Sequence, residues 1–95
     1  MLIHLVCFKY KAEVAEEVRA DHRAGLRALG TMDSVIALKV GADCVRSARS
    51  YDTGLSVTLA DRAALDVYQR DPRHLPVAQL GASLCEHIVA VDFEE

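Results

Sequence analysis

The chain has 95 residues, of which 52% are hydrophobic, and a formal net charge of -3. This length predicts one domain, residues 1–95, whose core is so small that a second subunit is expected to complete it. Lysine and arginine are scattered along the chain, which argues against nucleic acid or an anionic membrane as a partner. Length and composition therefore predict a small homodimeric domain that binds neither nucleic acid nor a membrane.

The N-terminal segment has no basic leader, and its apolar run is too short to span a membrane or to form the core of a signal sequence. The three cysteines, Cys7, Cys44 and Cys85, lie far apart and form no CxxC pair. This pattern fits neither a disulfide framework nor a zinc ligand set. We therefore expect a cytoplasmic protein whose cysteines stay reduced.

The first predicted element is a strand over residues 2–10, in which Val6 and Phe8 alternate with Leu5 and Cys7. Both faces of this strand are largely apolar, which is typical of a strand in the middle of a covered sheet. The alternation leads us to expect Cys7 on the side that faces the helices, as a small buried hydrophobic residue.

A helix is predicted over residues 11–29, with an apolar stripe on one side and Gly30 as its stop. Residues 35–41 alternate in the manner of a second strand. The polar segment 42–54 follows as a loop, which is long enough to serve as a flexible flap over a pocket mouth. Residues 55–59 form a third, shorter strand.

Asp61 is a predicted N-cap for a second helix, which ends near Asp71 because residue 72 is proline. A short helical piece over 76–84 and a last strand over 87–93 complete the chain. The resulting order is the βαββαβ arrangement of the α+β ferredoxin-like fold. One face of its sheet is left open. That face carries Val6 and Phe8 or their neighbours, so two sheets are expected to pack together as a closed barrel.

The segment from Tyr68 to His74 places a phenol and an imidazole on either side of Pro72, while His4 interrupts the apolar first strand. These groups predict a pocket that supports proton transfer. Plainer interpretations stay open for each. His74 could interact only with the carbonyl end of the preceding helix, Tyr68 could pack its ring and keep its hydroxyl in water, and His4 could donate to a backbone carbonyl.

The remaining histidines give weaker signals. His22 falls on or beside the apolar stripe of the first helix and could reach the cavity wall, although a histidine on the helix surface is the commoner outcome. His87 is expected to be exposed. No HxxxH or HxH pair exists, so the sequence predicts no metal site, and proton transfer by these side chains requires no cofactor.

Five segments of the chain together resemble the stress-responsive dimeric α/β-barrel (Dabb) family. They are residues 3–11, Val40-Gly41, Tyr51-Asp52, residues 68–74 and Val91-Asp92-Phe93. The resemblance covers nearly the whole chain. It implies a ferredoxin-like protomer and a homodimer, the dimeric α/β barrel, with a cavity in each subunit.

The best understood enzyme of that family is a plant polyketide cyclase, which closes a linear poly-β-ketone by intramolecular aldol condensation. The resemblance implies that His4, Tyr68 and His74 correspond to its working groups. In that role His74 would be the base, Tyr68 would orient it or donate to the enolate oxygen, and His4 would stabilise the same oxygen. The cyclase also has a histidine near the position of Thr53 and a tyrosine on helix one, which this chain lacks.

Three functions therefore remain open. The first is binding of a small apolar or carbonyl ligand without turnover, with Val6, Phe8 and His22 in the cavity wall. The second is a cofactor-free, cyclase-like enzyme. The third is an oxygenase of the wider dimeric barrel superfamily that acts on haem or a quinol. The family base rate favours the first, because most members have no assigned activity.

Overall fold

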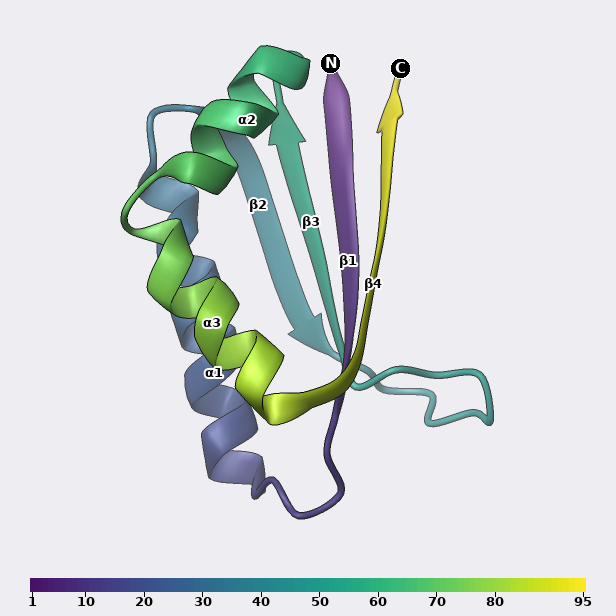
Figure 1. Ribbon diagram of the computed structural model, residues 1–95. Helices are drawn as coiled ribbons and strands as arrows, with labels where there is room; N and C mark the ends of the chain where they lie inside the picture. Colours follow the sequence, from purple (N-terminus) through teal and green to yellow (C-terminus); the bar gives the residue numbers. More distant parts are fainter.

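The computed structural model describes residues 1–95 as one sheet with its helices gathered on one side (Figure 1). The strands are β1 (Leu2–Tyr10), β2 (Val35–Ala42), β3 (Thr53–Leu59) and β4 (Cys85–Glu94). The helices are α1 (Glu16–Ala28), the 3-10 turn η1 (Leu29–Thr31), α2 (Arg62–Arg70) and α3 (His74–Leu84). This order confirms the α+β, ferredoxin-like arrangement predicted from the sequence.

The sheet has the order β2-β3-β1-β4, and every neighbouring pair is antiparallel. The strand β1 is therefore central. His4 on β1 lies opposite Val57 on β3 and opposite Asp92 on β4. Since directly opposed residues point to the same face of a sheet, this register brings the Asp92 carboxylate beside the His4 ring.

Alternation along β1 decides which face the helices cover. The buried residues are every second one, from Leu2 to Tyr10, and they include Val6 and Phe8. The expectation that Cys7 faces the helices is wrong, because Cys7 is exposed on the opposite face. The open face thus carries the neighbours of Val6 and Phe8. Both faces of β1 are apolar, so the alternation alone could not assign the inward one.

The first helix is shorter than predicted, because α1 begins at Glu16 rather than at residue 11. The chain before it makes a turn in which the Val14 N–H donates to the Lys11 carbonyl. The Arg19 guanidinium donates to the Val14 carbonyl at 2.9 Å and to the Lys11 carbonyl at 3.4 Å. Arg19 thereby satisfies backbone groups that a longer helix would have paired internally.

The second half of the chain follows its sequence signals closely. The Asp61 carboxylate accepts the Ala64 N–H at 2.9 Å, which confirms the predicted N-cap of α2. The helix α3 begins at His74, two residues earlier than predicted, and the His74 N–H donates to the Asp71 carbonyl. As a result, only three residues separate α2 from α3, and His74 is held close to α2.

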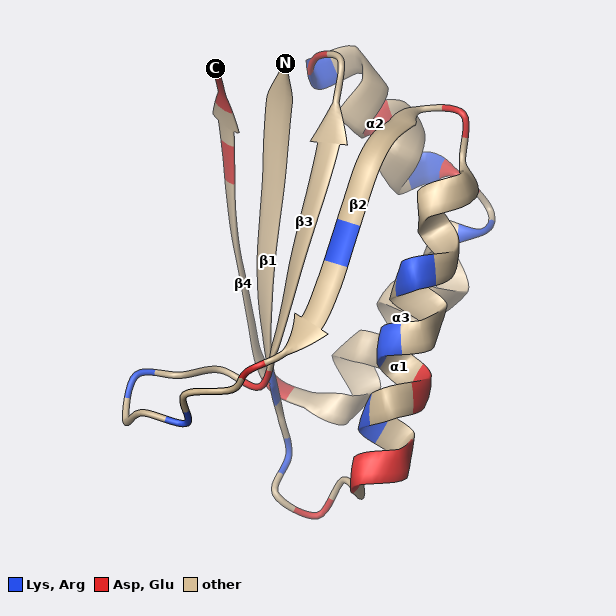
Figure 2. Ribbon diagram, turned by 180° about the vertical axis from the view of Figure 1, so that it is seen from behind, with Lys and Arg blue, Asp and Glu red and all other residues tan.

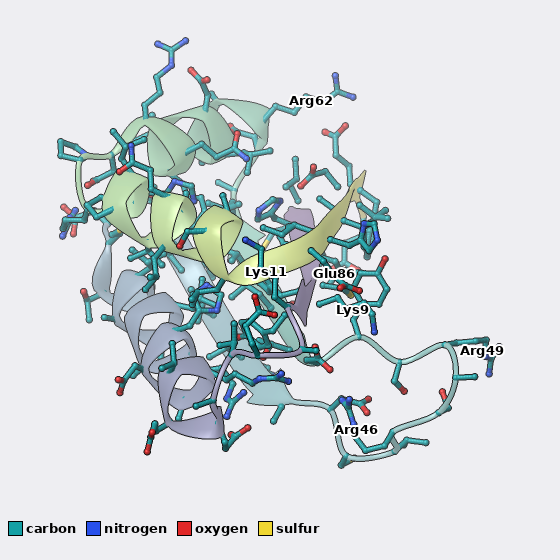
Figure 3. The ribbon with its side chains drawn as sticks, turned by 60° about the horizontal axis from the view of Figure 1, so that its bottom comes forward. Lys9, Lys11, Arg46, Arg49, Arg62 and Glu86 are labelled. Atoms are coloured by element: carbon teal, nitrogen blue, oxygen red, sulfur yellow. The ribbon has the colours of Figure 1, made fainter.

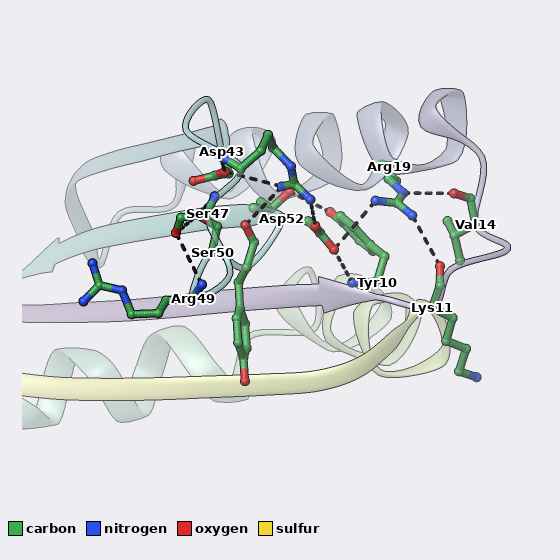
Figure 4. Close-up of polar contacts among 12 residues, drawn as sticks. Tyr10, Lys11, Val14, Arg19, Asp43, Ser47, Arg49, Ser50 and Asp52 are labelled. Carbon is green, nitrogen blue, oxygen red and sulfur yellow. Dashed lines mark hydrogen bonds and ion pairs between the residues drawn. The ribbon is translucent and has the colours of Figure 1, made fainter.

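The loop between β2 and β3 spans residues 43–52 and projects away from the helices (Figures 1 and 3). Its base is fixed by Asp52, whose carboxylate accepts the Tyr10 N–H and an Arg46 N–H, each at 2.8 Å (Figure 4). The Arg19 guanidinium lies 3.7 Å from the same carboxylate. Arg46 itself has a left-handed backbone, with φ of 54°, which an ion-paired loop can hold.

In Figure 2 the charged residues concentrate on the helices and this loop, whereas the strand ribbons are largely uncharged. None of the helices is long and apolar enough to span a membrane.

Candidate functional site

A cavity of about 220 Å³ lies between the helices and the covered face of the sheet. Its wall comes from all layers of the fold: from β1, β3 and β4 on one side and from α1, α2 and α3 on the other. The lining residues are mostly apolar and are His4, Val6, Phe8, Leu26, Leu55, Tyr68, Gln69, His74, Val77, Ala78, Ile88 and Ala90. All three predicted catalytic residues are among them, together with Val6 and Phe8.

No residue of the loop 43–52 belongs to this wall, so the flap expected from the sequence does not cover the cavity of its own chain.

Tyr68 is the most unusual residue of this wall. Its side chain is fully buried, and its hydroxyl has no hydrogen-bond partner within the chain. Burial raises the pKa of Tyr68 to about 12, so the phenol stays protonated at physiological pH. The plainer interpretation of Tyr68, in which its hydroxyl stays in water, is therefore wrong. A buried hydroxyl without a partner costs about 1 to 3 kcal/mol, which a ligand oxygen in the cavity would recover.

His4 stands next to Tyr68, with 6.1 Å between the ring centroids in an edge-on arrangement. Its Nδ1 makes a close contact with the Asp92 carboxylate. A carboxylate accepts hydrogen bonds, so this contact fixes the proton on Nδ1 and turns Nε2 into the nitrogen that is free for a ligand. The partner of His4 is thus a side-chain carboxylate rather than the backbone carbonyl considered from the sequence.

His74 also lies next to Tyr68, with 4.8 Å between their ring centroids. Burial lowers the pKa of His74, while a backbone hydrogen bond with Gln69 opposes the shift. The imidazole is consequently neutral near pH 7. Gln69 belongs to the last turn of α2, so His74 does interact with the carbonyl end of the preceding helix and lines the cavity as well.

His22 is the predicted site residue that does not line the cavity. It is fully buried, and its Nδ1 lies 2.7 Å from the Tyr10 hydroxyl, which is itself 3.0 Å from Thr53 Oγ1. The sequence favours a position on the helix surface for His22, and this prediction is wrong. His22 packs edge-on against Phe8, with 5.0 Å between centroids, so it supports the wall from behind.

The cavity carries no lysine or arginine in its wall. The chain also contains no group of three histidine, cysteine or acidic side chains placed to hold a metal ion. The only carboxylate that reaches the site is Asp92, and it lies behind His4. The arrangement can therefore donate and accept hydrogen bonds, but it offers no lysine or arginine to an anionic ligand.

Sequence reasoning missed Asp92 as a site residue. A signal was present, because Asp92 follows Ile88 and Ala90 at intervals of two, and both of these line the cavity. An acidic residue on the inward face of an apolar strand is as unusual as His4 is on β1. The partner could be assigned only once the register between β1 and β4 was known.

Comparison with known proteins assigns the chain to a family. The family model described as the stress responsive A/B barrel domain matches residues 2–95. The chain belongs to this Dabb family. The match covers nearly the whole chain and confirms the resemblance seen in the sequence. No curated protein matches the sequence.

Solved structures similar to this Dabb chain share its fold. A dimeric ferredoxin-like protein of unknown function from Thermobifida fusca has a TM-score of 0.90 at 22% identity and covers 99% of this chain and 90% of its own. A dimeric ferredoxin-like protein of unknown function from a Jannaschia species has a TM-score of 0.82 at 27% identity, over 99% and 98% of the two chains. The hydroxynitrile lyase from Passiflora edulis has a TM-score of 0.86 at 20% identity, over 97% and 90%.

Proposed function

We propose that this Dabb protein is a homodimer that binds a small, uncharged carbonyl compound in the cavity beside Tyr68. The observation that carries the proposal is Tyr68, a residue of the cavity wall whose hydroxyl is fully buried and has no partner in the chain. A protonated phenol donates well to a carbonyl oxygen. Binding a carbonyl compound would give this hydroxyl the hydrogen-bond acceptor that it lacks within the chain.

The size and charge of the cavity restrict the ligand further. Since an apolar cavity of about 150 Å³ holds benzene, a cavity of about 220 Å³ fits a compound of roughly ten non-hydrogen atoms. Its wall lacks lysine and arginine, so a carboxylate or phosphate would be buried there without a counter-charge. An unpaired buried charge costs several kcal/mol, which supports an uncharged ligand.

The proposal is tested by calorimetric titration with propiophenone, a neutral aromatic ketone of this size. We expect saturable binding, and we expect Tyr68→Phe to weaken it by roughly threefold to tenfold, the usual net effect of one hydrogen bond. The matched control is Tyr51→Phe, because Tyr51 lies in the loop 43–52 outside the cavity wall. Absence of binding, or equal affinity in wild type and Tyr68→Phe, would reject the proposal.

A cofactor-free enzyme that moves protons on such a carbonyl compound is the second candidate. It is supported by the neutral His74 and the His4–Asp92 pair, both of which lie next to Tyr68. An imidazole held by a carboxylate is a common arrangement of a general base. The Passiflora edulis structure belongs to a lyase, so the fold is compatible with catalysis.

For a turned-over substrate, we expect His74→Ala to lower kcat by roughly a hundredfold, because a general base contributes about 10² to 10⁴. Tyr68→Phe should cost less. A histidine base must be neutral, so the rate should fall as the pH drops through its pKa, and His74→Ala should remove that acid limb. An unchanged pH profile in His74→Ala would assign the base to another residue.

The homodimer is supported by the open face of the sheet. Leu5 on β1 lies opposite Val91 on β4, and Phe93 lies opposite Ile3. Leu5, Val91 and Phe93 are 36%, 62% and 42% exposed, which is a large apolar surface for a single chain. Similar structures are described as dimeric. The three free cysteines further support the cytoplasm as the site of action.

Sedimentation at micromolar concentration tests the homodimer. We expect wild type to sediment as a dimer and Leu5→Glu as a folded monomer, because a carboxylate would be buried without a partner between two apolar sheets. The control is Val67→Glu, which changes an exposed residue of α2 in the helix layer. A well-folded wild-type monomer would contradict this part of the proposal.

A further inference from the structure

The polar atoms around the cavity differ in what they can do for a ligand. Tyr68 brings a hydroxyl that stays protonated, because burial raises the pKa of Tyr68 to about 12. This hydroxyl is fully buried and unpaired within the chain. It therefore serves as the hydrogen-bond donor of the site, and it fits an acceptor oxygen of the ligand.

His4 brings an acceptor. Its Nδ1 is committed to the Asp92 carboxylate, and its Nε2 makes no hydrogen bond within the chain. In the neutral ring the proton thus sits on Nδ1, and Nε2 keeps its lone pair. Nε2 of His4 is therefore available as an acceptor for a ligand.

His74 brings a second acceptor. Burial lowers the pKa of His74, so the ring is neutral and one of its nitrogens carries a lone pair. Gln69 places its side chain at the exposed rim of the cavity, where it can adapt to either kind of group.

The buried part of the wall therefore offers a donor at Tyr68 and an acceptor at His4, and no lysine or arginine lines the cavity. A simple ketone would engage Tyr68 and leave the Nε2 lone pair of His4 without a donor. We infer that the natural ligand is a compact, uncharged hydroxy-carbonyl compound, whose carbonyl oxygen accepts from Tyr68 and whose hydroxyl donates to Nε2 of His4. This inference rests on the proposed carbonyl-binding function and specifies the ligand class for the same cavity.

The test compares two ligands that differ by one group. Phenacyl alcohol carries a hydroxyl where propiophenone carries a methyl group, and the two are otherwise alike in size. The ratio of their dissociation constants is measured by calorimetry for wild type and for His4→Phe. We expect the preference for phenacyl alcohol over propiophenone to be threefold to tenfold greater in wild type than in His4→Phe. This factor is the effect of one hydrogen bond.

The control variant is Tyr68→Phe, which should weaken both ligands by a similar factor and leave the ratio nearly unchanged. An equal ratio in wild type and His4→Phe would overturn the hydroxyl contact and leave the carbonyl-binding proposal intact. Failure of both ligands to bind wild type would reject the proposed function and this inference with it.

A second measurement does not depend on the stability of a variant. Imidazole nitrogen NMR of wild type should show the His4 proton on Nδ1 and an unprotonated Nε2, and phenacyl alcohol should shift the Nε2 signal toward that of a hydrogen-bonded acceptor. A protonated Nε2 in the free, neutral ring would overturn the inference. In that state Nε2 would be a hydrogen-bond donor and could not accept a hydrogen bond from the ligand hydroxyl.

Discussion

Two polar regions lie on the helix-covered side of the sheet, and they differ in how their buried groups are satisfied. At the loop end, the Asp52 carboxylate accepts from the Tyr10 N–H and from Arg46, with Arg19 close by. In the cavity wall, Tyr68 is buried even more completely, and its hydroxyl has no partner. The comparison shows that buried polar groups have two different roles in this protein. The satisfied carboxylate of Asp52 fixes the chain, whereas the unsatisfied hydroxyl of Tyr68, in the cavity wall, is available to a ligand.

The pKa values of the two regions follow the same division. Burial raises the pKa of the Asp52 carboxyl, yet the hydrogen bonds from Arg46 and the Tyr10 N–H outweigh this effect and keep the pKa below the usual value. In the cavity no charge compensates burial at Tyr68, so the phenol stays protonated. The loop end is thus built from charges, and the cavity from neutral groups.

The largest effect on stability is expected at the loop end. Asp52→Ala removes the acceptor of the Tyr10 N–H and of Arg46 and the charge that pairs with Arg19. We expect it to lower the free energy of unfolding by about 2 to 4 kcal/mol. Urea denaturation measures this loss. Glu94→Ala is the control, since the exposed Arg62–Glu94 pair should contribute at most about 1 kcal/mol. Equal losses in both variants would contradict the structural role of Asp52.

A moderate loss of stability is expected when the pH is lowered. Burial lowers the pKa of both His22 and His74 in the folded protein, whereas the unfolded chain takes up these protons near the ordinary histidine value of about 6.5. The unfolded state therefore binds more protons as the pH falls below about 6.5. The stability contributed by these neutral rings is present above that pH and is lost progressively below it.

Urea midpoints at pH 7.5 and 5.5 would measure this loss, both pH values being roughly one unit from the histidine value. We expect the decline to be smaller in His22→Phe, because that variant has one buried imidazole fewer. His87→Asn changes an exposed histidine and should leave the decline unaltered. A decline that His22→Phe does not reduce would show that other groups cause it.

The smallest effect is expected in the loop 43–52. Because this loop does not line the cavity, its amide exchange should stay the same when propiophenone binds. Amides of β1 and α2 near His4 and Tyr68 should exchange more slowly in the complex. Marked slowing within the loop would instead support the flap that the sequence suggested.

Much of the fold follows from local signals in the sequence. The period-two alternation of β1, the N-cap at Asp61 and the helix stop at Pro72 each act over a few residues, and the structure agrees with all three. The three candidate catalytic residues could also be named, since a polar group on an apolar strand and the Tyr68–His74 pair stand out without knowledge of their surroundings.

The remaining features depend on packing between distant segments. The covered face of β1 is set by where the helices dock, so the position of Cys7 could not be read from alternation. The burial of His22 depends on its contact with Tyr10 and Phe8 across the helix–sheet interface. Asp92 becomes the partner of His4 only through a strand register that joins the two ends of the chain.

The most direct test of the account is the stability of Tyr68→Phe beside that of Tyr10→Phe, measured by urea denaturation at equal protein concentration. Both hydroxyls are buried, but that of Tyr10 has His22 and Thr53 as partners. We expect Tyr10→Phe to lose about 1 to 3 kcal/mol and Tyr68→Phe to lose nothing or to gain up to about 1 kcal/mol, because only the second removes an unpaired group. A loss in Tyr68→Phe as large as that in Tyr10→Phe would contradict the claim that the Tyr68 hydroxyl is reserved for a ligand.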